Sequence, residues 1–197
     1  MKRMLSTAMI ASAVLLAGCA TTPRPGPIDV TRFHLGMPIA GDSIAVQPLT
    51  GFAGVSPEDQ LYIGAVSGEL GRLGFTPGGG EASPYIAAVS YKHENLGSVR
   101  TPPAVTIGVG GGSYSGRRGG GVGVGGGVGI PVGSKTVQVV ATELTVQIKR
   151  RSDGTILWEG RAVTEEAGAQ PMATANRLAK ALFKGFPGES GITITVK

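Results

Sequence analysis

The fold is decided by the stretch VATELTVQIKRRSDGTILWEGRA, residues 140–162. Apolar or threonine side chains recur at every second position from Val140 to Ile148, and polar side chains such as Glu143 alternate with them. This alternation is typical of a strand with one buried face. Asp153 and Gly154 form a dipeptide that favours a tight turn between antiparallel strands. We therefore expect a hairpin whose returning strand places three residues on one face: Ile156, Trp158 and Ala162.

Further segments with the same two-residue period predict the rest of a sheet. In the first of them, Thr31, Phe33 and Leu35 share one face, and Arg32 and His34 lie on the other. Apolar residues also occupy alternate positions in three more segments, around 44–48, 85–91 and 192–196. Each of these segments is short enough to be a single strand.

Two segments have the three-to-four-residue period of helices. The first starts at Ser56 and Pro57, which are favoured at the N-cap and first helical position, and it ends at Gly74, which suits a left-handed C-terminal residue. The second runs from about residue 171 to 184 and is stopped by Gly185 and Pro187. Three glycines inside the first helix are interpreted as places where it lies close to the sheet: Gly64, Gly68 and Gly71.

The order of these elements predicts an α+β fold. Helices separated by pairs of strands favour a mostly antiparallel sheet with both helices packed on one face. A glycine-rich insertion at residues 108–133 is expected to protrude from the sheet as a β-hairpin or loop. The expected organisation is a signal peptide at 1–18, a lipidated cysteine and proline-rich tether at 19–28, and a single domain at 29–197.

The first nineteen residues have the features of a bacterial export signal. Lys2 and Arg3 precede an uncharged apolar stretch that is too short for a permanent transmembrane helix. The stretch ends in Leu-Ala-Gly followed by Cys19, which resembles the lipobox at which lipoproteins are cleaved and acylated, for example with palmitate. Cys19 is the only cysteine of the chain, so lipidation would leave no thiol for a disulfide or for catalysis. The residue after it is Ala20 and not aspartate, and by resemblance to the sorting rule of Gram-negative lipoproteins this implies an outer-membrane lipoprotein that faces the periplasm.

Composition excludes several classes of protein. Glycine accounts for 34 of 197 residues, but it has no strict three-residue period, so the chain is not a collagen. Hydrophobic residues make up 41% of the chain and charged residues only 16%, a balance that excludes disorder throughout. The formal net charge of +5 is mild and scattered, and we expect no nucleic-acid partner.

The insertion contains 14 glycines in its 26 residues. A Gly-x-Gly-x-x-Gly match at Gly121 to Gly126 is not followed by a helix, so it does not predict a nucleotide site. Glycines at every fourth position permit membrane helices, but charged residues and a proline interrupt the series. Alternating valines favour a long, flat hairpin, with plain disorder as the alternative. The candidate interaction surface on it comprises Val109, Tyr114, Arg117, Arg118, Val122 and Val124.

No catalytic, cofactor or metal site is expected from the sequence. His34 and His93 are the only histidines, and neither is spaced with other ligands as in a zinc site. No nucleophile-elbow motif accompanies them. The one site residue that the sequence assigns with a stated chemistry is therefore Cys19, for lipidation.

Several of these features together resemble a known family. They are the lipobox, the proline-rich tether, the strand at Thr31 to His34, the helix ending in Leu73-Gly74-Phe75, and the segment Trp158-Glu159-Gly160 before the last helix. This combination is similar to the proteobacterial lipoproteins of the domain-of-unknown-function 4136 family (DUF4136). The resemblance implies an envelope lipoprotein of uncharacterised role, with no catalytic residues to transfer.

The expected function is a non-enzymatic interaction or envelope-assembly module, attached to the membrane through Cys19 and contacting an envelope protein or the cell wall. Two alternatives remain open. One is a small-ligand-binding or hydrolytic protein with a pocket between helices and sheet, which a polar pocket holding His34 or His93 beside an acid would favour. The other is an oligomeric membrane-associated element built by the insertion. The sequence does not determine the partner, the ligand or the oligomeric state.

Overall fold

The computed structural model describes residues 25–39, 41–51, 54–100, 105–108, 129–132 and 136–197. The predicted export signal, the lipidation of Cys19 and the candidate surface from Val109 to Val124 lie outside these residues. Within the described ranges, no helix is long and apolar enough to cross a membrane.

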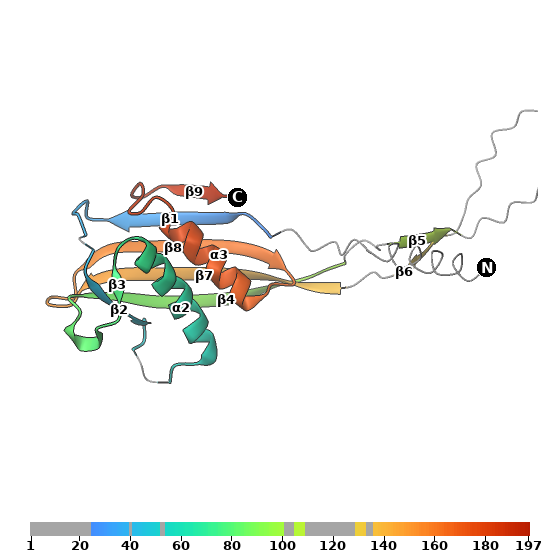
Figure 1. Ribbon diagram of the computed structural model, residues 1–197. Coiled ribbons are helices and arrows are strands. Elements are labelled where there is room, and N and C mark those ends of the chain that lie inside the picture. The colour runs from blue at the N-terminus through green and yellow to red at the C-terminus, as the bar shows by residue number, and fades with distance from the viewer. Residues whose placement is uncertain (1–24, 40, 52–53, 101–104, 109–128, 133–135) are drawn as a thin grey trace, which may run out of the picture.

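The domain is built on a mixed seven-stranded sheet (Figure 1). Its strands, in spatial order, are β3 (Thr76–Pro77), β2 (Ser43–Pro48), β4 (Tyr85–Arg100), β7 (Thr136–Arg150), β8 (Ile156–Ala167), β1 (Ile28–His34) and β9 (Thr193–Val196). The pairs β2–β3 and β2–β4 are parallel, and the other pairs are antiparallel. The predicted α+β class and order of elements are thus confirmed, and the sheet is mixed because β2 connects to β4 through a helix.

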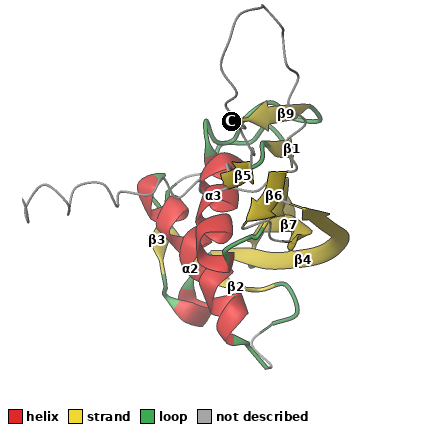
Figure 2. Ribbon diagram, turned by 90° about the vertical axis from the view of Figure 1, so that its right-hand side faces the viewer, coloured by secondary structure: helices red, strands yellow, loops and turns green. Residues whose placement is uncertain are grey.

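Two helices cover one face of this sheet (Figure 2). Helix α2 (Pro57–Arg72) begins with the predicted capping box, in which the Ser56 side chain accepts from the Asp59 N–H and the Asp59 carboxylate accepts from the Ser56 N–H. Its C-cap is Leu73, and the next residue, Gly74, has the predicted left-handed conformation, with a φ of 91°. Helix α3 (Pro171–Phe183) packs beside α2. A short 3₁₀ helix, η2 (Gly80–Ala82), precedes β4.

The hydrophobic core lies between the helices and the sheet. The 140–162 hairpin supplies its centre, because the alternating side chains from Thr142 to Ile148 are buried in β7 as predicted, and only Val140 at the start is partly exposed. Trp158 and Ala162 of β8 are fully buried as expected, whereas Ile156 is exposed because the register shifts next to the turn. The largest buried apolar side chains around this centre are Val30, Ile44, Val66, Leu70, Leu144, Val146, Ile148, Leu178 and Leu182.

The first strand faces the opposite way from the prediction. Phe33 and Leu35 are 54% and 60% exposed, and the inward face of β1 carries Val30 and Arg32. Arg32 is only 3% exposed, because its guanidinium reaches backbone carbonyl groups at the end of α3. The strand is where the alternation predicts it, but the predicted inward and outward faces are exchanged, because Arg32 is buried and Phe33 is exposed.

The glycines inside α2 do not mark a close approach to the sheet. Gly64, Gly68 and Gly71 are exposed, and a Cβ built on any of them would meet nothing within 4 Å. The helix instead contacts the core through Tyr62, Val66 and Leu70. That interpretation of the three glycines is wrong.

The insertion starts where β4 and β7 continue beyond the helices. Their pairing ends at Arg100 and Thr136, and further along β5 (Val105–Gly108) pairs antiparallel with β6 (Gly129–Val132). Residues 109–128 between them are not described. Figure 1 shows that these strands leave the domain at the end where the chain enters β1.

Candidate functional site

A pocket of about 280 Å³ opens between the two helices and the centre of the sheet. Glu58 and Tyr62 of α2 form one wall, and the beginning of α3 forms the other. The floor comes from the neighbouring strands β4 and β7. The lining residues are Glu58, Tyr62, His93, Val140, Thr142, Ala169, Pro171 and Thr174.

Pairing between strands places His93 in this pocket. His93 of β4 is the direct cross-strand partner of Thr142 in β7, and its Nδ1 lies 3.1 Å from the Thr142 Oγ1. The other ring nitrogen, Nε2, lies 2.8 Å from the Glu58 carboxylate. The His93 and Glu58 side chains are 36% and 41% exposed, which puts them at the mouth of the pocket.

The proton positions follow from the chemistry of the partners. An ionised carboxylate only accepts hydrogen bonds, so Nε2 of His93 must carry the proton that it shares with Glu58. In the neutral ring Nδ1 is then an acceptor, and the Thr142 hydroxyl donates to it. These two hydrogen bonds fix the orientation of the imidazole and leave neither ring nitrogen free to bond a group inside the pocket.

Tyr62 differs from these residues because its hydroxyl has no partner. The side chain is fully buried, and its hydroxyl oxygen makes no hydrogen bond within the described part of the chain. The ring stacks on Tyr91 with a centroid separation of 4.2 Å. Burial raises the pKa of Tyr62 far above its usual 10.0, and the nearby Glu58 carboxylate adds to the effect. The hydroxyl therefore stays neutral and remains a donor without an acceptor.

The start of α3 completes the wall. Its N-cap, Gln170, makes no side-chain capping bond to the described first turn. Thr174 of that turn donates to the Glu166 carboxylate at 2.7 Å, and Glu166 is also paired with Arg177. The charge of Glu166 is thus neutralised, and the uncompensated charge near the pocket is that of Glu58 when His93 is neutral.

The arrangement is suited to binding rather than to hydrolysis. Glu58, His93 and Thr142 have the acid–imidazole–hydroxyl order of a nucleophilic triad. Thr142, however, is only 1% exposed, so its hydroxyl is not accessible to the carbonyl group of a substrate. The apolar surfaces of Val140, Ala169 and Pro171 instead provide contacts for a small molecule.

The other histidine lies elsewhere. His34 is at the end of β1, where its Nε2 lies 3.0 Å from the Gly188 carbonyl and its Nδ1 accepts from the Gly36 N–H. The structure therefore does not bring the two histidines together. Within the described residues, no group of three or more His, Cys, Asp or Glu side chains is arranged to hold a metal.

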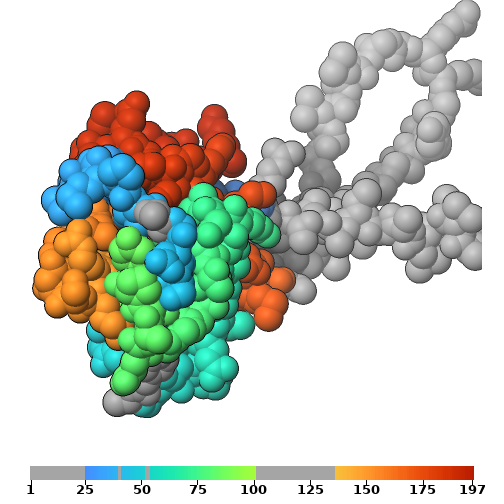
Figure 3. All heavy atoms as spheres, turned by 60° about the vertical axis from the view of Figure 1, so that its left-hand side comes forward, coloured from blue at the N-terminus to red at the C-terminus, as the bar shows by residue number. Residues whose placement is uncertain are grey.

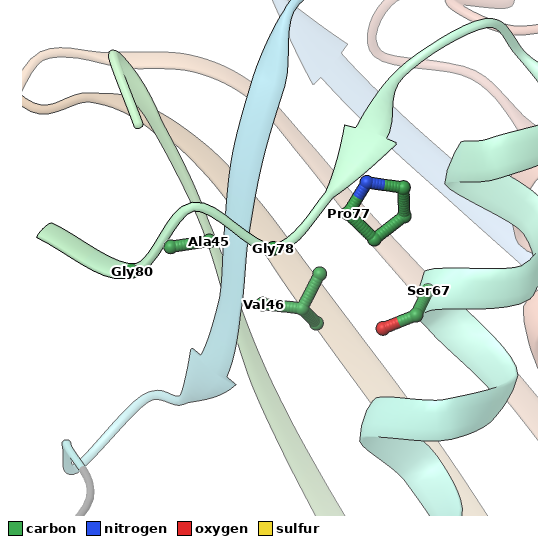
Figure 4. A pocket seen from close by; sticks show the side chains of 6 residues that line it. All are labelled: Ala45, Val46, Ser67, Pro77, Gly78 and Gly80. Atoms are coloured by element: carbon green, nitrogen blue, oxygen red, sulfur yellow. The ribbon is translucent and has the colours of Figure 1, made fainter. Parts of the chain in front are cut away.

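A larger and shallower hollow of about 440 Å³ lies between β2 and α2. Figure 4 shows Val46, Ser67 and Pro77 around it, with Gly78 and Gly80 along its rim. Figure 3 shows the surface at this end of the domain, where β2 lies next to the segment that carries β3 and η2. The side chains around this hollow are small, and none of those that line it is charged.

Sequence reasoning named His93 but not its partners. The helix pattern that starts at Ser56 and Pro57 singles out neither Glu58 nor Tyr62. The signal that could have found the site is the register of β4 against β7, which sets His93 opposite Thr142. Composition and local periodicity do not contain that register.

The described residues form an α+β fold with two helices on one face of a mixed sheet, and a pocket lies between the helices and the sheet. The chain belongs to the family of the domain of unknown function DUF4136, whose model matches residues 52–188. An uncharacterised protein of Zymomonas mobilis is 31% identical over 214 residues, which cover 87% of this chain and 80% of that protein.

Two solved structures show similar but distant arrangements. A PelC dodecamer from Paraburkholderia phytofirmans has 12% identity and a TM-score of 0.46, over 79% of this chain and 94% of that one. A PDZ domain protein from Parabacteroides distasonis has 9% identity and a TM-score of 0.48, over 87% of this chain and 39% of that one. At these identities and scores the likeness supports no inference about activity.

Proposed function

We propose that this protein is a lipoprotein of the Gram-negative outer membrane that faces the periplasm and acts as a non-enzymatic interaction or assembly module. The observation that carries the proposal is that the chain enters β1 at the same end of the domain at which β4 and β7 extend beyond the helices (Figure 1). An anchor at Cys19 and a contact surface on the insertion would then both face the membrane.

The strand register supports this geometry. Thr164 of β8 pairs with Ile28 at the start of β1 and with Thr142 of β7. The start of β1 therefore lies level with Thr142. Strand β7 extends from Thr142 back to its first residue, Thr136, which lies three residues after the end of the insertion. The segment before β1 is held at this end by Arg177, whose Nη2 donates to the Gly26 carbonyl at 2.6 Å.

The insertion is suited to strand-like contacts. Antiparallel pairing of β5 with β6 supports a hairpin that continues the β4–β7 ribbon. Glycine and valine leave the backbone of such a ribbon accessible to pairing with another strand. We place the contact with a partner on the candidate interaction surface, Val109 to Val124, with Tyr114, Arg117 and Arg118 between its valines.

Site-specific photo-crosslinking in the native envelope tests this contact. A crosslinker at Tyr114 should give a discrete adduct identifiable by mass spectrometry, whereas one at Glu81, on the far end, should not. Deleting residues 108–133 should abolish the partner interaction and leave the unfolding transition of the domain unchanged. Equal adducts from both positions, or an interaction that survives the deletion, would contradict the proposed surface.

Membrane attachment has its own test. Cys19→Ala removes the thiol that would carry the acyl chains, so the variant should be uncleaved or released from the membrane. Fractionation of cells expressing both forms measures this directly. A variant that is processed normally and stays in the outer-membrane fraction would exclude lipidation at Cys19.

A second candidate function, small-ligand binding, is favoured by the pocket between helices and sheet. His93 lies beside an acid in this pocket, as this alternative expects, while Val140, Ala169 and Pro171 make part of the lining apolar rather than polar. The near-complete burial of Thr142 supports binding over the hydrolytic form of the same alternative.

A further inference from the structure

We infer that β9, at one edge of the sheet, is the docking surface for β9 of a second copy of this chain, and that an antiparallel pair of these strands joins the two sheets into one. Figure 1 shows β9 at the border of the sheet, beyond β1. The proposed contact through the insertion does not use this edge, so the inference goes beyond the proposed function.

The two edges of the sheet differ in how well they are protected from such pairing. At one edge β3 has only two residues, Thr76 and Pro77, and its neighbour β2 ends at Pro48. Prolines and short strands prevent an edge from pairing with another chain. At the other edge, residues 192–196 are Ile-Thr-Ile-Thr-Val, all β-branched and uncharged, which favours a strand. Within the described part of the chain, β9 pairs only with β1, so its outer edge is open.

The backbone groups that face this open edge belong to two threonines. Successive residues of a strand direct their N–H and C=O groups to opposite neighbours. Val30 of β1 points towards β9, because the carbonyl of Arg32, two residues on, accepts from the loop before β9. Ile194 is the partner of Val30 and therefore bonds to β1. Thr193 and Thr195, on either side of it, direct their N–H and C=O groups outwards.

The apolar side chains of β9 are exposed at the same edge. Ile194 is paired with the buried Val30, so it lies on the face of the sheet that carries the helices (Figure 2). Helix α3 packs over β7, β8 and β1. Ile194 is nevertheless 39% exposed, and Ile192, just before the strand, is 51% exposed. A strand added beside β9 would remove this apolar row from water.

The edge is complementary to itself in one register. When two copies of β9 run antiparallel about a two-fold axis at Ile194, Thr193 of each copy exchanges backbone hydrogen bonds with Thr195 of the other. Ile194 then meets its own copy, and Ile192 meets Val196. These are non-hydrogen-bonded pairs, in which side chains approach most closely. The register therefore satisfies the outward backbone groups and buries the apolar row at once.

Charge favours the same register. A two-fold axis places equivalent residues near each other, so charged residues close to the axis would repel. Residues 191–196 carry no charge, and the nearest charged side chains along the chain, Lys197 and Glu189, are exposed. In the register centred on Ile194, Lys197 lies opposite Gly191 of the other copy, two residues from its Glu189. Opposite charges are thus brought near each other at both ends of the pair.

The pairing also determines how two anchored copies would lie. Because the strands run antiparallel, the two tethers leave the joined sheet at opposite ends. Residues 19–27 can span at most about 30 Å. Both of the anchors proposed at Cys19 would reach one membrane when the strands run along its surface.

Cysteine substitution at the axis tests the pairing directly. Cα atoms of a non-hydrogen-bonded pair are about 4.5 Å apart, which a disulfide can bridge. In membranes of cells that express the full chain, Ile194→Cys should form a disulfide-linked dimer on mild oxidation, seen on a non-reducing gel. Two controls are Thr195→Cys, whose copies would lie out of register with each other, and Glu81→Cys, near the opposite edge. Both should give no more dimer than the wild type.

Charge substitutions test the two-fold symmetry. Ile194→Lys and Ile194→Glu each place like charges opposite each other, so the dissociation constant of the dimer should rise at least about tenfold. Sedimentation velocity of the full chain in detergent provides the measurement. An equal mixture of the two variants should recover the dimer, because opposite charges then meet. Ile156→Lys is the control, because Ile156 is 41% exposed and lies outside β9, and this variant should dimerise as the wild type does.

The outcomes decide between a second copy and another occupant. A disulfide-linked dimer from Ile194→Cys alone, with recovery in the mixture of charged variants, supports the pairing. No such dimer, equal dimer from all three cysteine variants, or a mixture that stays monomeric would overturn it. A disulfide between Ile194→Cys and a different protein would also overturn it, and would identify that protein as the occupant. None of these results bears on the contact proposed for the insertion.

Discussion

Two buried polar side chains lie near opposite ends of α3, and they differ in how well their hydrogen-bonding groups are satisfied. Arg32, near the C-terminus of α3, donates to the carbonyl oxygens of Ala181, Leu182 and Lys184 at 2.9–3.0 Å. Tyr62, in the pocket near the N-terminus of α3, has no partner within the described residues. The difference separates two energetic roles: a satisfied buried group holds the fold, and an unsatisfied one costs the folded state stability.

Arg32 replaces a conventional cap for the last turn of α3. The final carbonyl groups of a helix lack partners within the helix and carry partial negative charge, so a cation near them is stabilised. Burial lowers the pKa of Arg32, yet the group remains charged because its ordinary value is 12.5. Gly188 lies against this guanidinium, and a Cβ there would come within 2.8 Å of its atoms. The arginine therefore joins β1, α3 and the following loop.

The largest expected effect follows from removing this cation. Arg32→Met keeps most of the side-chain volume but leaves three carbonyl groups at the end of α3 without their donor. An unsatisfied buried acceptor costs about 1–3 kcal/mol, so we expect a loss of about 3 kcal/mol or more in the free energy of unfolding, measured by urea denaturation. Arg161→Met on the exposed face of β8 is the control and should change stability by less than about 0.5 kcal/mol. Similar losses in both variants would remove the structural role assigned to Arg32.

The capping box of α2 should contribute less to the free energy of unfolding than Arg32 does. Ser56→Ala removes the acceptor for the Asp59 N–H and should lower the free energy of unfolding by about 1 kcal/mol. Hydrogen bonds from Ser56, first from its backbone N–H and then from its side chain, hold the pKa of Asp59 below its usual range, so the stability that the Asp59 carboxylate adds is present above the unfolded-state pKa and is lost as the pH falls through the folded value. Ser56→Ala keeps the backbone N–H, whereas Asp59→Asn removes the carboxylate, so urea titrations at neutral and acidic pH should show Asp59→Asn and the wild type converging in acid. A constant difference between these two proteins across pH would contradict this coupling.

A smaller effect is expected within the pocket. Thr142→Val exchanges the hydroxyl that donates to His93 for a methyl group of similar size. Water can replace it at the half-exposed imidazole, so the free energy of unfolding should change by less than about 1 kcal/mol. Thermal denaturation provides the measurement. A loss as large as that for Arg32→Met would mean that the pocket's polar side chains serve the fold, and the comparison would fail.

The ionisation of Tyr62 should not affect the free energy of unfolding at neutral pH. Its effect on stability should appear only at alkaline pH. Its folded-state pKa is raised, so the folded protein keeps the proton after the unfolded chain has begun to lose it. Stability should therefore decline as the pH rises above about 10, the ordinary tyrosine value. The decline should be shallower in Tyr62→Phe. Parallel curves for the two proteins would show that Tyr62 does not ionise differently on folding.

The same contrast explains what could be predicted from sequence. The strand from Val140 to Ile148, the Asp153-Gly154 turn and the Ser56 cap are local patterns, and the structure confirms all of them. The orientation of β1 could not be predicted, because alternation assigns Phe33 to the core and gives no sign that Arg32 would reach the end of a helix about 150 residues away. The partners of His93 depend on the register of two long strands, which is a property of the assembled sheet.

The unfolding free energy of Tyr62→Phe, measured by urea denaturation without ligand, tests the central claim most directly. If the hydroxyl is unsatisfied, its removal relieves a desolvation cost, and the variant should be more stable than the wild type by about 1 kcal/mol or more. Tyr91→Phe, whose hydroxyl lies near Ser56 and Asp59, should not gain stability. A Tyr62→Phe variant less stable than the wild type would show that the hydroxyl holds the fold, as Arg32 does, and would contradict the distinction between the two ends of α3.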